Sequence, residues 1–146
     1  VTLGPNEDYV LVNETGMGRV HRLWLKGERA GEQDVFIDEL PGTPDNIRFD
    51  GENTFWIAMP SLRASLDSLA SLPRLRALLA FLPIPWLEAA AQPASFVIGV
   101  NLEGKVLHNL QDQDNPFHYI TGVTPCGDAL YLGSLETEAI GVLPKP

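Results

Sequence analysis

The chain has 146 residues, of which 45% are hydrophobic and 20% are charged. This composition is that of one globular domain with a sizeable core, and it excludes a disordered chain. The formal net charge is −9, and because an acidic surface repels phosphate backbones we do not expect nucleic acid as a partner.

The chain alternates short strand-like runs with turns rich in glycine and proline, of which it has 13 and 12. The expected strands fall into three groups: residues 1–3, 9–13, 19–25 and 34–38; then 46–50, 54–59, 95–101 and 105–110; then 119–124, 129–134 and 139–143. Units of four short strands with a repeat of roughly 40–50 residues are typical of β-propeller blades. We therefore expect an all-β fold with about three blades over residues 1–146, the third blade lacking its fourth strand.

The second group is interrupted by residues 61–91, where the strand pattern gives way to helical periodicity. Leucines recur there every three or four residues, at positions 62, 66, 69, 72, 75, 78, 79 and 82. We expect a helical insertion that is divided by Pro73 and ended by Pro83. Two uses stay open: the helices pack against the propeller, or they form a lid over its mouth that also contacts a membrane or an apolar substrate. The sequence shows no signal peptide or membrane-spanning run, and the localisation stays open.

An acidic residue and an amide stand side by side at the mouth of a predicted strand. Asp45 and Asn46 directly precede the run that continues with Ile47, and Pro41 and Pro44 fix the approach of the chain. Carboxylate and amide oxygens are hard ligands of the kind that calcium prefers. The alternative is an Asx turn, in which the Asp45 side chain accepts hydrogen bonds from nearby backbone amides.

Four segments carry a resemblance to a known family: residues 9–15, 19–27, 44–48 and 129–135, which read YVLVNET, RVHRLWLKG, PDNIR and ALYLGSL. In this order and spacing they resemble the strictosidine synthase-like family, most of all its adipocyte plasma membrane-associated branch. The resemblance implies a six-bladed propeller of the paraoxonase and gluconolactonase type, of which this chain is the C-terminal half. The start at Val1, inside a predicted strand, agrees with a piece of a longer protein.

The same resemblance implies calcium in the central tunnel, with Asp45 and Asn46 as ligands. The relatives take a further asparagine and a glutamate from positions before Val1, so the site is expected to be incomplete in this chain. The acid–base glutamate of strictosidine synthases falls on or beside Thr121. Because a threonine hydroxyl transfers no proton near neutral pH, we do not expect strictosidine synthase activity itself.

Two other side chains are candidates for roles near the strand mouths. His118 lies at the entrance of a predicted strand and is a candidate catalytic base for metal-assisted hydrolysis, since the pKa of histidine suits that task. The alternative is a structural histidine with its hydrogen bonds satisfied. Glu14, at a predicted strand end, is expected to hydrogen-bond a neighbouring blade.

Two functions follow from these observations. The first is a calcium-dependent ester or lactone hydrolase, similar to an arylesterase or lactonase, in the full-length form. The second is a non-catalytic partial propeller that binds an apolar ligand, or a membrane surface through residues 61–91. Because half a propeller exposes two open faces, we also expect a homodimer or higher homo-oligomer.

Overall fold

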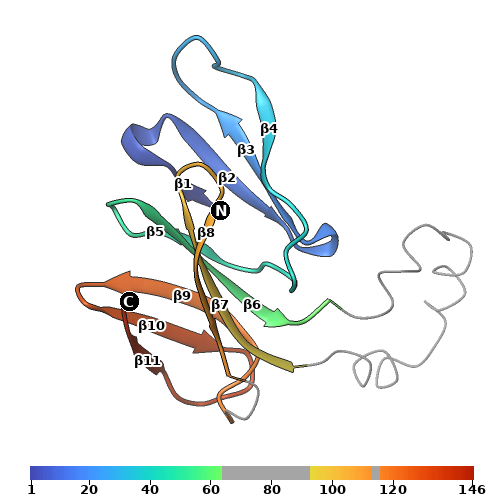
Figure 1. Ribbon diagram of the computed structural model, residues 1–146, viewed down its shortest axis with the longest axis vertical. Coiled ribbons are helices and arrows are strands. Elements are labelled where there is room, and N and C mark those ends of the chain that lie inside the picture. The colour runs from blue at the N-terminus through green and yellow to red at the C-terminus, as the bar shows by residue number, and fades with distance from the viewer. Residues whose placement is uncertain (64–92, 113–115) are drawn as a thin grey trace, which may run out of the picture.

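A computed structural model describes residues 1–63, 93–112 and 116–146 of the chain (Figure 1). These residues form eleven strands in three antiparallel sheets, which confirms the all-β fold. The strands are β1 (Thr2–Leu3), β2 (Tyr9–Glu14), β3 (Arg19–Trp24), β4 (Gln33–Ile37), β5 (Ile47–Phe49), β6 (Thr54–Ser61), β7 (Pro93–Asn101), β8 (Val106–Gln111), β9 (Ile120–Cys126), β10 (Ala129–Ser134) and β11 (Gly141–Pro144). Two 3₁₀ turns, η1 (Pro5–Glu7) and η2 (Thr15–Met17), lie before and after β2.

Each sheet is a meander in which strands that follow one another along the chain pair side by side. The strand orders are β1-β2-β3-β4, β5-β6-β7-β8 and β9-β10-β11. Figure 1 shows the three sheets fanned out one beside the next, and we call them the first, second and third blade. This architecture is that of part of a β-propeller.

The expected helical insertion falls largely on residues 64–92, which lie outside the described residues. Its first residues are described. Ser61 is the last residue of β6 and pairs with Pro93 of β7, while Leu62 forms an isolated bridge with Gly42. Residues 61 and 62 therefore lie in the sheet region, and the described chain leaves and re-enters the second blade between two adjacent strands.

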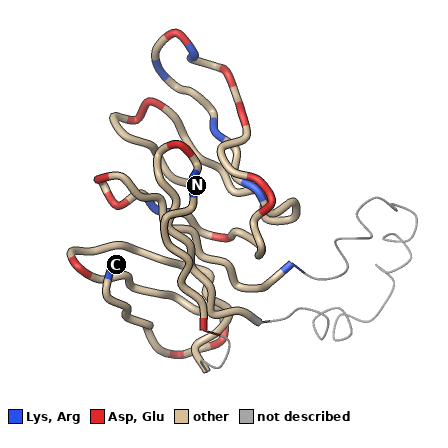
Figure 2. Tube along the Cα trace, in the orientation of Figure 1, with Lys and Arg blue, Asp and Glu red and all other residues tan. Residues whose placement is uncertain are grey.

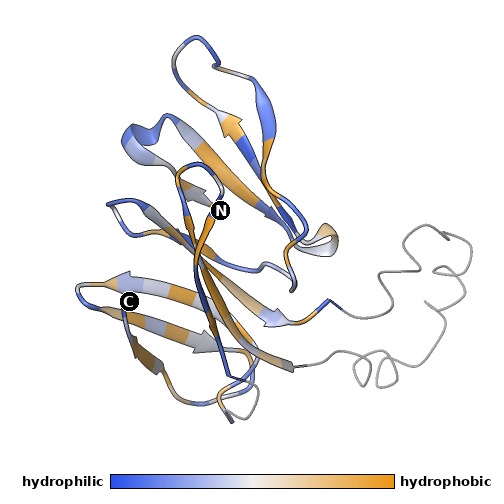
Figure 3. Cartoon of the chain, viewed as in Figure 1, coloured by the Kyte–Doolittle hydropathy of each residue, from blue (hydrophilic) through white to orange (hydrophobic). Residues whose placement is uncertain are grey.

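Strand β6 carries the hydrophobic core on both of its faces, as its continuous run of buried residues indicates. Phe55, Ile57 and Met59 point into a cluster between the first and second blades. Trp56 and Ala58 point into a second cluster, between the second and third blades. The central blade is therefore hydrophobic on both sides, and Figure 3 shows orange residues among paler ones where its strands cross the middle of the molecule.

Lys, Arg, Asp and Glu lie mainly in the turns and in strands β2 to β5, whereas strands β6 to β11 contain none (Figure 2). The most connected group is on the first blade, where Arg22 and Arg29 both bind Asp34. Among the described residues, no helix has the length and apolar character needed to cross a membrane.

Candidate functional site

The backbone of Asp45 and Asn46 is paired with the middle of β6. The Asp45 N–H donates to the Ala58 carbonyl at 2.9 Å, and the Ala58 N–H donates to the Asn46 carbonyl at 2.9 Å. The two residues thus extend β5 toward one end of the second blade, with Asp45 half-buried and Asn46 exposed. The segment enters this position from Pro44, which is buried.

The Asp45 carboxylate does not form the Asx turn that the sequence left open. Within the described part of the chain it accepts no hydrogen bond and forms no ion pair. An Asx turn of this blade is at Asp50, whose Oδ1 accepts the N–H groups of Glu52, Asn53 and Thr54 at 2.9 to 3.1 Å. The Asp45 carboxylate therefore remains free to bind a ligand.

Asn46 joins the second blade to the third. Its N–H and its Nδ2 both donate to the carbonyl of Thr121, at 3.2 and 2.7 Å. Thr121 lies in β9 where the register with β10 shifts between Gly133 and Ser134, so a β-bulge sits at this position. Since both nitrogens of Asn46 point to Thr121, its side-chain Oδ1 is left without a partner among the described residues.

Asn13 joins the first blade to the same point. Its Nδ2 donates to the Asp45 carbonyl at 2.6 Å, while its Oδ1 is buried and has no partner in the described residues. Sequence analysis missed Asn13 and expected the interblade bond from Glu14 instead. Glu14 binds within its own blade, because its Oε2 accepts from Arg19 Nε at 2.6 Å and lies 2.7 Å from His21 Nε2. The hydrogen bond from Arg19 lowers the pKa of Glu14, and the hydrogen bond with His21 has a smaller effect in the same direction.

His118 lies just before β9, three residues ahead of Thr121. Its Nε2 is 3.4 Å from Glu136 Oε2, and its carbonyl accepts the Ser134 hydroxyl at 2.7 Å. The next residue, Tyr119, has a φ of 51°, an uncommon value for a residue other than glycine. In the part of the chain that the structure describes, no hydrogen bond or ion pair connects His118 to Asp45 or Asn46. The structure therefore places His118 just before β9 of the third blade, bound to Glu136 and Ser134.

Known proteins resemble almost the whole of this chain. The adipocyte plasma membrane-associated protein of Rattus norvegicus is 33% identical over 147 residues, which cover 96% of this chain and 39% of the relative. Strictosidine synthase-like protein 6 of Arabidopsis thaliana is 36% identical over 136 residues, covering 92% of this chain and 35% of the relative. Strictosidine synthase-like protein 10 of the same plant is 34% identical over 149 residues, covering 97% and 40%. The chain belongs to the strictosidine synthase-like family. No family model matches it.

The chain spans about two fifths or less of the length of these strictosidine synthase-like relatives. At its blade junction it presents the side-chain oxygens of Asp45 and Asn46, which are of the type that calcium binds. Calcium takes about six to eight oxygen ligands, so two side chains alone fill a minor part of its coordination. Among the described residues, no group of three or more histidine, cysteine, aspartate or glutamate side chains is placed to hold a metal. The residues fit calcium in chemical type but not in number, so Asp45 and Asn46 alone do not complete a calcium site.

Proposed function

We propose that this chain is part of a calcium-dependent hydrolase of esters or lactones, in which Asp45 and Asn46 are metal ligands. The observation that carries the proposal is the position of their side-chain oxygens. Both lack partners in the described residues, and both sit on a backbone that is hydrogen-bonded to all three blades. The ligand type agrees with calcium, and the hydrogen bonds fix the backbone that carries these oxygens without a metal.

When bound, calcium would supply a Lewis acid that polarises the carbonyl group of an ester or lactone. The roles of the chain's own residues follow from their contacts. Asp45 and Asn46 would supply the ligand oxygens from a backbone that hydrogen bonds hold in place. Glu136 faces Nε2 of His118 at 3.4 Å, so a neutral ring that keeps its proton on Nε2 leaves Nδ1 to accept a proton from water. Thr121 has no group that transfers a proton near neutral pH, and we do not propose the condensation of an amine with an aldehyde.

Calcium titration of Asp45→Ala tests the metal assignment, with Asp128→Ala as the matched control. Asp128 is exposed and lies in the turn after β9, at the opposite end of that strand from Thr121. Both variants remove one carboxylate and therefore lower the net negative charge equally. We expect isothermal titration to show weaker calcium binding for Asp45→Ala alone. Equal binding by the wild type and Asp45→Ala would remove the assignment, and loss in both variants would indicate a general charge effect.

The second candidate is a module that binds an apolar molecule without turnover. It is supported by an open groove of about 360 Å³ between the second and third blades. Six of its lining residues are apolar: Val97, Leu110, Phe117, Ile120, Leu132 and Leu143. Grooves of this size with an apolar lining and a few polar groups are typical of small-molecule sites. We expect Leu110→Glu to abolish binding of an apolar fluorescent probe, and Leu107→Glu, at an exposed position on the same strand, to retain it.

A further inference from the structure

One peptide unit connects all three blades. The carbonyl of Asp45 accepts Nδ2 of Asn13 from the first blade, and the N–H of Asn46 donates to the Thr121 carbonyl of the third blade. This carbonyl and this N–H belong to the same planar trans peptide group, so they point in opposite directions. The first blade therefore binds the carbonyl side of the peptide group between Asp45 and Asn46, and the third blade binds its N–H side.

Asn13 is placed for this contact by the pairing of its own sheet. It lies opposite Val20, which is fully buried, so its side chain shares the face that packs against the second blade. A second contact between these blades lies at the other end of β5, where the Phe49 N–H donates to Thr2 Oγ1 at 3.4 Å. The segment from Asp45 to Phe49 is thus attached to the first blade at both ends, and among the hydrogen bonds of the described residues the one from Asn13 is the link from the first blade to the candidate ligands.

The contacts of Asn13 are not those expected of a residue that only stabilises the fold. Its Oδ1 is buried without a partner in the described residues, and a buried polar atom without a partner lowers stability. Its Nδ2 makes one bond, whose net contribution is of similar size or smaller. An apolar side chain of similar volume would avoid the unpaired oxygen. A residue that does not improve stability but fixes a ligand-bearing peptide suggests a role in positioning.

We propose that Asn13 is a positioning residue that fixes the Asp45–Asn46 peptide, and through it the direction of the Asp45 carboxylate. The proposal rests on the proposed role of Asp45 as a calcium ligand. If the Asn13 bond is removed, the peptide keeps its bond to Thr121 but loses its restraint on the carbonyl side, so it can rotate about the neighbouring bonds. The Asn46 amide then exchanges faster, and the ligand oxygens of Asp45 and Asn46 lose their common orientation.

The test is Asn13→Leu in the 146-residue chain, with Thr2→Val as the control that removes the contact at the other end of β5. Amide hydrogen exchange at Asn46, followed by NMR, measures the peptide without any metal, and calcium titration measures the ligands. We expect Asn13→Leu to leave thermal stability unchanged or higher, to speed Asn46 exchange, and to weaken calcium binding about tenfold, as changes next to metal ligands do. Thr2→Val should change neither the exchange at Asn46 nor calcium binding.

The outcomes separate this proposal from the proposed function. Unchanged Asn46 exchange in Asn13→Leu overturns the positioning role, and so does faster exchange with unchanged calcium affinity. If the wild type binds no calcium while Asn46 exchange is still faster in the variant, the proposed calcium site is wrong, but Asn13 does fix the Asp45–Asn46 peptide. Should leucine not fit, Asn13→Ala removes the same bond with a smaller side chain and is judged by the same two measurements.

Discussion

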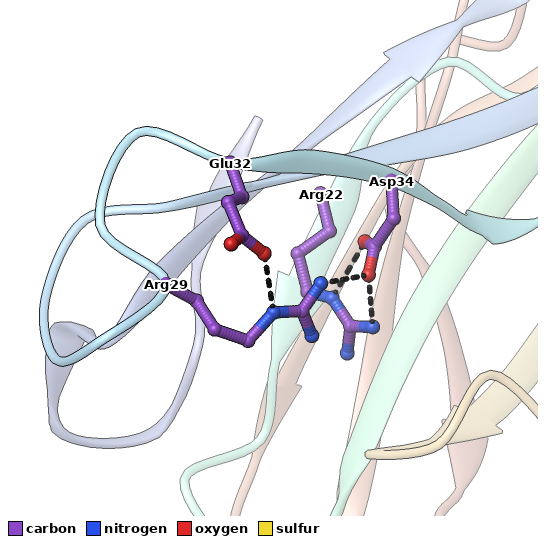
Figure 4. Close-up of polar contacts among 4 residues, drawn as sticks. All are labelled: Arg22, Arg29, Glu32 and Asp34. Carbon is purple, nitrogen blue, oxygen red and sulfur yellow. Dashed lines mark hydrogen bonds and ion pairs between the residues drawn. The ribbon is translucent and has the colours of Figure 1, made fainter.

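Arg22 binds both carboxylate oxygens of Asp34 on the neighbouring strand, with Nε to Oδ1 at 2.9 Å and Nη2 to Oδ2 at 2.8 Å (Figure 4). The two residues are direct partners in the β3–β4 ladder. Arg29 adds a bond to Oδ2 at 3.1 Å, and the Arg22 guanidinium lies 4.6 Å from the centre of the Trp24 ring. This pair connects the outer strands of the first blade, and its geometry is that of a strong arginine–carboxylate interaction.

The first prediction concerns the pH dependence of this pair. Hydrogen bonds from Arg22, with help from Arg29, lower the pKa of Asp34 from 3.8 to about 2. Because the pKa of Asp34 is lower in the folded state, ionised Asp34 stabilises the fold at pH values above its unfolded pKa near 3.8. This stabilisation is lost as the pH falls toward 2. We expect Asp34→Asn to reduce the free energy of unfolding by about 1–2 kcal/mol at pH 7, after allowance for solvent screening.

Urea denaturation at pH 7 and at pH 2 measures this difference. The control is Glu32→Gln, because the Glu32 carboxylate accepts a hydrogen bond from Nε of Arg29 at 2.8 Å and both side chains are exposed. Surface pairs of this kind contribute roughly 0–1 kcal/mol, so the control should change little at either pH. An Asp34→Asn effect that is equally large at pH 2 would show that the loss comes from packing and not from the charge.

The second prediction concerns the turn between β7 and β8. Gly104 has a φ of 84°, and a β-carbon there would overlap the carbonyl oxygen of Phe36 in β4. Gly51 has a nearly equal φ of 85°, but a β-carbon there would meet no atom within 4 Å. Both alanine variants therefore carry the same backbone strain, and Gly104→Ala should be less stable by a further 1–3 kcal/mol or so. Thermal melts of both variants measure the difference, and equal melting temperatures would mean that the turn moves away at no cost.

The strands could be read from the sequence because turn residues and alternating hydrophobic residues are local signals. The burial of β6 on both faces was not among the sequence-based predictions, although the run from Phe55 to Met59 is continuously apolar. The contact of Asn13 with Asp45 could not be read in this way, because 32 positions separate the two residues and only the packing of two blades brings them together. An asparagine at a strand end is common, so its local sequence gave no signal. The assignment of the interblade bond to Glu14 was wrong because the nearby Arg19 and His21 bind that carboxylate first.

The third prediction is that residues 64–92 can be removed without unfolding the β body. Ser61 pairs with Pro93 and Met59 pairs with Phe96, so a short glycine-containing turn can join β6 to β7 directly. We expect the deletion variant to keep its β-type circular dichroism and a cooperative thermal transition. A broad, non-cooperative melt would show that the removed leucines belong to the main core.

The fourth prediction is self-association, which we propose because each outer blade presents an open apolar face. Strand pairing places Val12 and Val35 on the same face of the first blade as His21, and both valines are exposed. On the third blade Tyr131 and Val142 are paired and exposed, and β11 has no further strand beside it in the described residues. Such faces and edges are usually covered in stable proteins.

Two copies of three blades would form a closed ring of six and would bring two Asp45–Asn46 pairs to a shared tunnel, giving calcium more oxygen ligands. Light scattering at low micromolar concentration should therefore show a homodimer or a higher assembly. Val35→Glu should shift the protein toward monomer, because it places a charge on the open face of the first blade. Val106→Glu is the matched control, since the two valines are 45% and 44% exposed and Val106 lies in β8, on neither outer blade. A wild-type monomer that unfolds cooperatively would contradict the prediction, and it would mean that the open blade faces remain soluble without a partner.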